Sequence, residues 1–288
     1  MNSINLENLT MPESTRCAYL FRYLYELESV KLPKNATIIH SLIFDECSKL
    51  KNVDIPDTVT TIGFCAFQDC GIESITLPDT ITSISFGAFQ ACKNLESIVL
   101  SNQLDEISDQ AFWRCVSLKS INIPDSVKII SCKAFYECKK LKSITLPNSL
   151  TIIGEEAFGN CTDLESITIP DSVTIIDKGA FKGCKNLKDI TIPNSVTLID
   201  LSVFENCESL ERIKLPERVT EIRNSAFEGC RSLKNITLPD TITAIGEHAF
   251  SECESLETVT IISDSTSKII DVRELDLDTM DQWIFLLF

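Results

Sequence analysis

The chain has 288 residues, of which 44% are hydrophobic, 24% are charged and 7% are aromatic, so it can bury a sizeable core. Its net charge of −16 disfavours contact with nucleic-acid phosphates, which need clustered Lys and Arg, and with an anionic membrane surface. The composition therefore predicts a folded, acidic protein that does not bind nucleic acid.

The N-terminus carries no sign of a signal peptide. The segment from Met1 to Asn5 has neither a basic n-region nor an apolar h-region. No stretch reaches the roughly 18 consecutive apolar residues that a membrane-spanning helix requires. The sequence thus predicts a cytoplasmic location without membrane insertion, where the 13 cysteines are reduced thiols.

A phenylalanine recurs every 23 residues, with one spacing of 22, and in ten of the eleven copies a cysteine follows it by three residues. The ladder comprises Phe21, Phe44, Phe67, Phe89, Phe112, Phe135, Phe158, Phe181, Phe204, Phe227 and Phe250. A fixed period of this length indicates a solenoid, because one short coil cannot bury its apolar side chains alone. Like residues are therefore expected to stack, Phe on Phe and Cys on Cys.

Each copy predicts the same short elements, here described for Pro170 to Pro193. The alternation in Leu187-x-x-Ile190-x-Ile192 predicts a short strand that the next proline ends. An Asp/Asn-Ser/Thr pair follows most prolines, and its side-chain oxygens are expected to accept hydrogen bonds from turn amides. A second extended piece covers Val173 to Ile176. The Ala-Phe-x-x-Cys-x-x-Leu stretch predicts a single helical or 3-10 turn, and no long helix is expected.

The ladder extends over almost the whole chain, so we expect one elongated domain over residues 1–288. Residues 1–33 form an N-terminal partial coil and the first repeat, 34–261 the regular repeats, and 262–288 an irregular C-terminal cap. Leu6 to Pro12 repeats the strand motif, and the apolar run from Trp283 to Phe288 is expected to fold back over the last coil.

These motifs resemble the BspA-like class of leucine-rich repeat proteins, whose 23-residue pattern is matched nearly verbatim from Ser149 to Leu164. The resemblance implies a right-handed solenoid with a parallel β-sheet. It also implies a non-catalytic scaffold, since similar proteins are mostly surface or secreted adhesion and binding proteins. A cell-surface location is therefore the alternative to the cytoplasm.

The sequence offers no catalytic, cofactor or metal site. His40 and His248 lie nine coils apart, and no phosphate-binding loop or nucleophile motif is present. The cysteines lack the spacing of a zinc site and are expected to pack in the core. The off-ladder Cys17, Cys65 and Cys132 are predicted to be the more exposed thiols.

Five residues are predicted to contact a protein partner, whose identity the sequence does not give. Asp189, Arg212 and Lys214 interrupt the Ser/Thr rows on the outer face of the sheet. Trp113 and Tyr136 follow the ladder Phe on adjacent coils, where most coils carry a small or polar residue. The two aromatic rings are types common in interfaces, but they can instead pack over Arg114 or Lys133 and shield the coil.

Two other functions are open at this point. The solenoid can be the targeting fragment of a larger enzyme. It can also be a structural protein that associates end to end, because an uncapped solenoid exposes strand edges.

Overall fold

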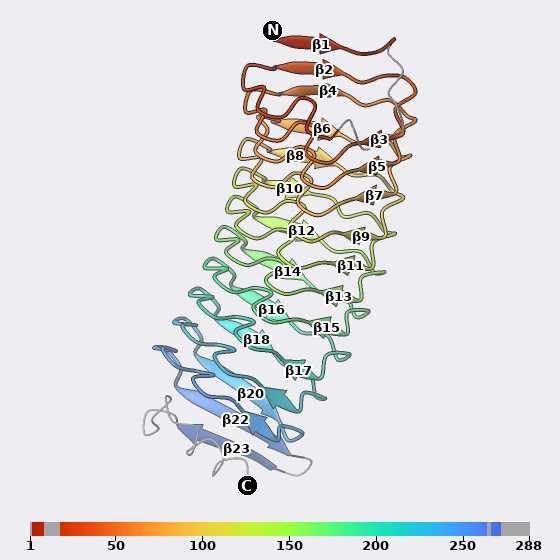
Figure 1. Cartoon of the computed structure of the whole chain (residues 1–288). Coiled ribbons are helices and arrows are strands. Elements are labelled where there is room, and N and C mark those ends of the chain that lie inside the picture. The colour runs from red at the N-terminus through yellow and green to blue at the C-terminus, as the bar shows by residue number, and fades with distance from the viewer. Residues whose placement is uncertain (1, 9–17, 264–265, 272–288) are drawn as a thin grey trace. The chain divides into compact units, whose positions relative to one another are not determined.

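The computed structural model describes residues 2–8, 18–263 and 266–271, and the chain divides into two compact units, 1–149 and 150–288. Each unit is a stack of coils, and a typical coil contains a three-residue strand, a two-residue strand and hydrogen-bonded turns (Figure 1). The described residues contain no helix. The predicted repeat solenoid is therefore confirmed, while the single domain over 1–288 stays a prediction.

In the first unit, two series of strands follow one another along the stack (Figure 1). The first series consists of β1 (Ser3–Asn5), β2 (Ser29–Lys31), β4 (Asn52–Asp54), β6 (Ser74–Thr76), β8 (Ser97–Val99), β10 (Ser120–Ile121) and β12 (Ser143–Thr145). The second consists of β3 (Ile38–Ile39), β5 (Thr61–Ile62), β7 (Ser83–Ile84), β9 (Glu106–Ile107) and β11 (Ile129–Ile130). The pairing is parallel, as in β2 with β4 and β5 with β7.

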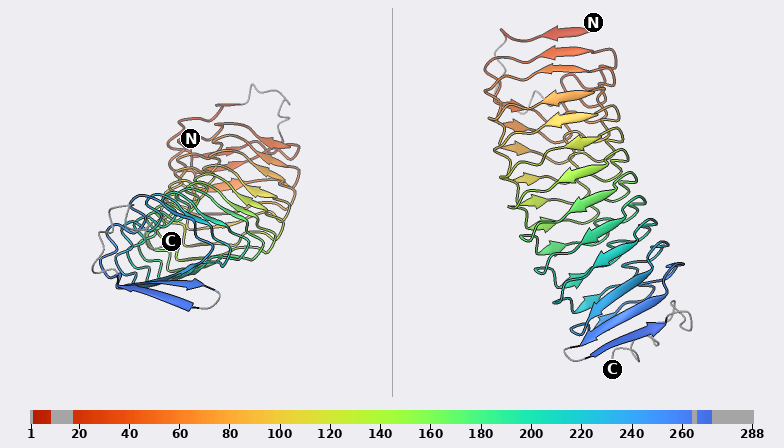
Figure 2. Two further views of the ribbon diagram at one scale, coloured as in Figure 1. Left: turned by 90° about the horizontal axis from the view of Figure 1, so that it is seen from below. Right: turned by 180° about the vertical axis from the view of Figure 1, so that it is seen from behind.

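The second unit repeats this arrangement, seen from behind in Figure 2. Its first series is β14 (Ser166–Thr168), β16 (Asp189–Thr191), β18 (Arg212–Lys214), β20 (Asn235–Pro239), β22 (Thr258–Ser263) and β23 (Thr266–Asp271). Its second series is β13 (Ile152–Ile153), β15 (Ile175–Ile176), β17 (Leu198–Ile199), β19 (Glu221–Ile222) and β21 (Ala244–Ile245). β20 pairs with β22 in parallel, and β23 pairs with β22 antiparallel.

The core of each unit is built on the phenylalanine ladder. In the first unit, ring centroids from Phe21–Phe44 to Phe112–Phe135 lie 5.3–5.7 Å apart, with interplanar angles of at most 14°. In the second, the pairs from Phe158 to Phe250 have the same range of separations. The rings from Phe44 to Phe250 are fully buried, so like residues stack on like as predicted.

The ladder cysteines are buried and hydrogen-bonded. Cys115 Sγ donates to the carbonyl oxygen of Phe89 on the preceding coil at 3.1 Å, and Cys207 Sγ donates in the same way to Phe181 at 3.2 Å. Burial raises the pKa of the Cys184 thiol to about 12. The cysteines thus pack as predicted and stay protonated. Among the off-ladder thiols, Cys132 is partly exposed, Cys65 is buried, contrary to the prediction, and Cys17 lies outside the described residues.

The Ala-Phe-x-x-Cys stretch differs from the expected helical turn. The residues two before and two after each ladder Phe have positive φ, for example Gln110 (55°) and Arg114 (59°) around Phe112. Backbone amides bond alternately within the turn, as Ala111 to Ser108 at 3.1 Å, and to the next coil, as Phe112 to Ala134 at 2.9 Å. A helical or 3-10 turn needs negative φ throughout, so these residues form separate turns that join neighbouring coils.

The hydroxyls behind the prolines also act differently from the prediction. Most of them donate hydrogen bonds to carbonyl oxygens of the preceding coil instead of accepting them from turn amides, whereas the buried hydroxyls of Ser126 and Ser172 have no hydrogen-bond partner within the described residues. Thr80 Oγ1 lies 2.7 Å from Val59 O, and Thr241 Oγ1 lies 2.6 Å from Val219 O. The Ser/Thr at this position therefore satisfies backbone acceptors between coils.

Both ends depart from the predicted register. The N-terminal strand is Ser3–Asn5, with Ile4 opposite Val30, so Leu6 follows this strand and does not open a new one, contrary to the predicted motif from Leu6 to Pro12. Residues 9–12 of that motif lie outside the described residues. The alternation of Ile4 and Leu6 matches that of Val30 and Leu32, and Leu6 is buried. At the other end, part of the predicted irregular cap is regular, because β22 and β23 form an antiparallel pair. The predicted packing of residues 283–288 lies outside the described residues.

Candidate interaction surfaces

The first ladder coil carries a cluster of exposed aromatic and leucine side chains. We call it the tyrosine surface, and it consists of Tyr19, Leu20, Tyr23, Leu24 and Tyr25. Their exposed fractions are 55%, 54%, 44%, 40% and 51%. The ring of Phe21 stacks on Phe44 at 5.7 Å and anchors this segment to the core. The surface therefore combines a fixed backbone with exposed rings.

Two of these tyrosines have an unfavourable backbone conformation. Tyr19 and Tyr23 have φ of 67° and 65°, at the two positions that flank the ladder Phe. Glycine takes such positions in three other coils, for example Gly179 and Gly183 around Phe181, while non-glycine residues hold most of the others. A bulky residue in this region is rare and costs about 1–2 kcal/mol. The other coils have the same left-handed positions, so what distinguishes the first coil is that it places two exposed tyrosine rings there.

Arg22 holds the two rings in place. Its Nε lies 2.7 Å from Oδ2 of the fully buried Asp45, and its Cζ lies 4.3 Å from the Tyr23 centroid and 5.6 Å from that of Tyr19. Burial raises the pKa of the Asp45 carboxyl, while the hydrogen bond from Arg22 opposes this shift. Asp45 thus fixes a guanidinium against both exposed tyrosines, which restricts their rotamers before any partner binds.

A pocket of about 390 Å³ opens beside Tyr25. Its lining includes Glu46, Asp69 and Lys93, and the last two form an ion pair at 3.0 Å. Burial and the nearby Glu46 charge raise the pKa of the Tyr25 hydroxyl. The phenol at the edge of the surface is therefore a hydrogen-bond donor at neutral pH.

The predicted residues Trp113 and Tyr136 are only partly exposed. Arg114 Cζ lies 4.7 Å from the Trp113 ring centroid, and Lys133 Nζ lies 5.9 Å from that of Tyr136. This matches the alternative in which the rings pack against cationic neighbours and shield the coil. Their role in binding a partner stays a prediction.

The structure brings Asp189 and Arg212 together. They lie opposite each other on β16 and β18, and Arg212 donates from Nε and Nη2 to the two carboxylate oxygens at 2.7 and 3.2 Å. This hydrogen bond lowers the pKa of Asp189. Lys214 lies opposite Thr191. The break in the Ser/Thr row is thus an ion pair between strands, and its role in partner binding stays a prediction.

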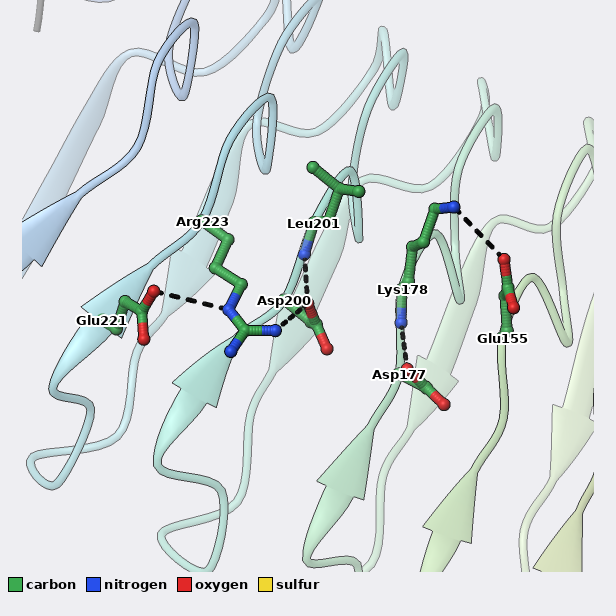
Figure 3. A network of polar contacts seen from close by, with 7 residues as sticks. All are labelled: Glu155, Asp177, Lys178, Asp200, Leu201, Glu221 and Arg223. Carbon is green, nitrogen blue, oxygen red and sulfur yellow. Dashed lines mark hydrogen bonds and ion pairs between the residues drawn. The ribbon is translucent and has the colours of Figure 1, made fainter.

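A second polar network in the same unit follows the ends of the two-residue strands (Figure 3). Arg223 bridges Asp200 at 2.9 Å and Glu221 at 3.4 Å, and Lys178 pairs with Glu155 at 3.4 Å. The carboxylate of Asp200 also accepts a hydrogen bond from a backbone amide. Opposite charges on neighbouring coils offset one another here, so the network supports the stack.

The described residues contain no group of three or more His, Cys, Asp or Glu that could hold a metal ion. In the same part of the chain, no helix is long and apolar enough to cross a membrane.

The sequence analysis missed the tyrosine surface, although the composition carried a signal. Three of the four tyrosines lie within residues 19–25. Tyr19 and Tyr23 lie neither in the outward rows of the sheet nor at the position after the ladder Phe, but at the two left-handed positions of the turn. Recognising those positions requires the backbone angles.

A family model described as the BspA type leucine-rich repeat region matches residues 14–142, 105–231 and 199–271. Among solved structures, a leucine-rich repeat protein from Bacteroides ovatus is 26% identical, with a TM-score of 0.60, covering 89% of this chain and 86% of that protein. The T. pallidum leucine-rich repeat protein is 31% identical, with a TM-score of 0.54, covering 56% of this chain and 78% of that one. No curated protein matches the chain.

Proposed function

The chain belongs to the BspA-type leucine-rich repeat family, and on that premise we propose that it is a non-catalytic scaffold that binds a protein partner through the tyrosine surface. Adhesion to another cell or matrix is one form that such binding would take. The same family membership supports a cell-surface location. Protease treatment of intact cells tests that location, because a surface protein is degraded and a cytoplasmic one is protected.

The observation that carries this proposal is the tyrosine surface itself. Tyrosine and arginine are enriched among residues whose removal weakens interfaces, and here Arg22 lies against the rings of Tyr19 and Tyr23 while the ring of Tyr25 lies 6.2 Å from that of Tyr23. Tyrosine supplies a large contact area at low entropic cost, and the buried Asp45 reduces that cost further by fixing Arg22.

The partner has to reach beyond the five residues of the tyrosine surface. A stable interface takes about 20–30 residues from each protein. The pocket beside Tyr25 continues the surface over the neighbouring coils through Glu46, Asp69 and Lys93. We therefore expect a globular partner that covers the tyrosine surface and this pocket together.

Capture from a native extract tests the proposal. The immobilised wild-type chain is compared with Tyr23→Ser/Tyr25→Ser and with a control, Val99→Ser/Ile175→Ser, whose residues are 58% and 48% exposed elsewhere. We expect at least tenfold less of a captured protein with the tyrosine variant only. Equal capture by both folded variants refutes the tyrosine surface. Variants Trp113→Ala/Tyr136→Ala and Arg212→Ser/Lys214→Thr test the regions predicted from sequence.

A second candidate function is self-association through β1. Among the described strands, β1 is the last of its sheet and pairs only with β2, and strands at a sheet edge are the places where a strand of another copy can add. Light scattering over a range of concentrations decides this, because a constant monomer mass excludes it.

A further inference from the structure

Two phenylalanines outside the ladder form an exposed aromatic step on the first unit. Phe64 and Phe86 stand three residues before the ladder Phe on adjacent coils, and their rings stack at 5.4 Å with an angle of 13°. Phe64 is 45% exposed and Phe86 is partly exposed. Most other coils carry a polar or small residue here, such as Ser41, Asp109 or Glu155. The core therefore does not require these rings.

On the next coil, the position equivalent to Phe64 and Phe86 carries the shorter side chain of Asp109. The carbonyl oxygens of Phe64, Phe86 and Asp109 each accept from an amide of the preceding coil at 2.8–3.0 Å, so the three residues hold equivalent places. Asp109 follows Phe86 on the side opposite Phe64. A pocket of about 370 Å³ lies there, lined by Phe86, Glu106, Asp109, Ile84 and four serines.

The charge of this pocket indicates what can occupy it. Glu106 and Asp109 are exposed, no ion pair involves either of them within the described residues, and no Lys or Arg lines the pocket. One oxygen of each carboxylate already accepts a hydrogen bond within the protein. Ser108 Oγ donates to Glu106 Oε1 at 2.9 Å, and the Cys132 amide donates to Asp109 Oδ1 at 2.8 Å. Each carboxylate keeps a second oxygen for a ligand.

We propose that this aromatic step and its pocket bind a segment of a partner protein in which a Lys or Arg side chain has an apolar neighbour. The cation lies between the ring of Phe86 and the carboxylates of Glu106 and Asp109, where cation–π attraction and charge-assisted hydrogen bonds act together. The apolar neighbour covers the exposed ring of Phe64. The site shares no residue with the tyrosine surface or with the pocket beside Tyr25, so variants can be made in one without changing a side chain of the other.

An NMR titration of the full chain tests this proposal with acetyl-Gly-Leu-Arg-Leu-Gly-amide as the probe. The control probe carries citrulline in place of arginine, which keeps the shape and removes the charge. We expect saturable shifts at the amides of residues 84–87 with the arginine peptide, and at least tenfold weaker binding of the citrulline peptide. No saturable shift, or equal binding of the two peptides, overturns the proposal. Equal binding of maltose and the arginine peptide would point instead to a saccharide site.

Two charge-removing variants of the protein test whether the carboxylates of Glu106 and Asp109 bind the arginine side chain of the peptide. Glu106→Gln/Asp109→Asn should weaken binding of the arginine peptide about tenfold, whereas Glu217→Gln/Asp240→Asn, which removes two exposed charges in the second unit, should change it less than twofold. Equal effects of the two variants would show non-specific attraction to an acidic protein and refute the site. The citrulline comparison on wild-type protein decides the question if a variant fails to fold.

Discussion

Raising the pH should unfold this protein through its cysteine ladder. Burial raises the pKa of each described ladder thiol with a resolved shift, to about 11 for Cys47 and to about 12 for Cys92, Cys184 and Cys253, from an ordinary value of 9.0. A raised pKa in the folded state means that the stabilising contribution is complete below pH 9 and is lost as the pH rises toward the folded value. In that range only the unfolded chain releases the protons.

The magnitude follows from the linkage relation. At about pH 10 each buried thiol costs about 1.4 kcal/mol of unfolding free energy. Each unit contains four such thiols, so each unit loses about 5–6 kcal/mol of unfolding free energy in total. They are Cys47, Cys70, Cys92 and Cys115 in the first unit and Cys184, Cys207, Cys230 and Cys253 in the second. A whole domain is typically stable by only about 5–15 kcal/mol.

Guanidinium denaturation under reducing conditions, between about pH 7 and 10, measures this loss. In a Cys17→Ser/Cys132→Ser background, which lacks the two off-ladder thiols that are not shown to be buried, thiolate absorbance near 240 nm, corrected for tyrosinate, should appear only with unfolding. The Cys207→Ala variant should lose about 1.4 kcal/mol less than wild type over the same interval, although its stability at neutral pH is lower. A native Cys17→Ser/Cys132→Ser protein that absorbs as thiolate at about pH 9.5, or an unfolding free energy that is the same at both ends of the range, refutes the inward-facing ladder.

Three further predictions concern stability and are read from chemical denaturation. Phe204→Ala should cost about 3–5 kcal/mol and Glu211→Ala less than about 1 kcal/mol, because only the first removes a stacked core ring, and similar losses would contradict the register. Gly71→Ala should lower the free energy of unfolding by about 1–3 kcal/mol, since a Cβ there would lie 2.3 Å from a backbone oxygen of the preceding coil. An unchanged free energy of unfolding would show that this coil packs less closely than described. Ser202→Gly should stabilise the protein by about 0.5–1 kcal/mol because the φ of Ser202 is 55°. Thr197→Gly, at a position without positive φ, should destabilise it, and a loss of stability in both variants would refute the left-handed turn.

The repeat made most of the fold predictable. The 23-residue period fixed which residues stack, and even the charged row after each strand behaves as expected, with Lys51 pairing with Glu73 at 2.7 Å and Lys119 with Glu96 at 2.7 Å. The turns were less predictable, because apolar residues three apart suit a helical turn as well as the observed pair of left-handed turns. The strand Ser3–Asn5 was not identified from the sequence, since Leu6 fits the alternation of two different registers.

The candidate sites were harder to infer, because each depends on a departure from the repeat. Arg212 departs from the Ser/Thr row, yet the structure shows Asp189 as its partner. Tyr23 and Phe64 also depart from the pattern, and their exposure depends on backbone angles and on the side chains of neighbouring coils. A single sequence shows that such a residue is unusual, while its contacts show whether the fold already accounts for it.

Site-specific photo-crosslinking tests the central claim most directly. A benzophenone amino acid is placed at Tyr25 on the tyrosine surface, and in a control at Ile175, which has a similar exposed fraction of 48%. The proposed function predicts one discrete crosslinked protein from position 25 alone, lost when unlabelled wild-type chain is added in excess and retained when Tyr19→Ser/Tyr23→Ser chain is added. Crosslinking of the same protein from position 175, or equal competition by the two chains, would contradict it.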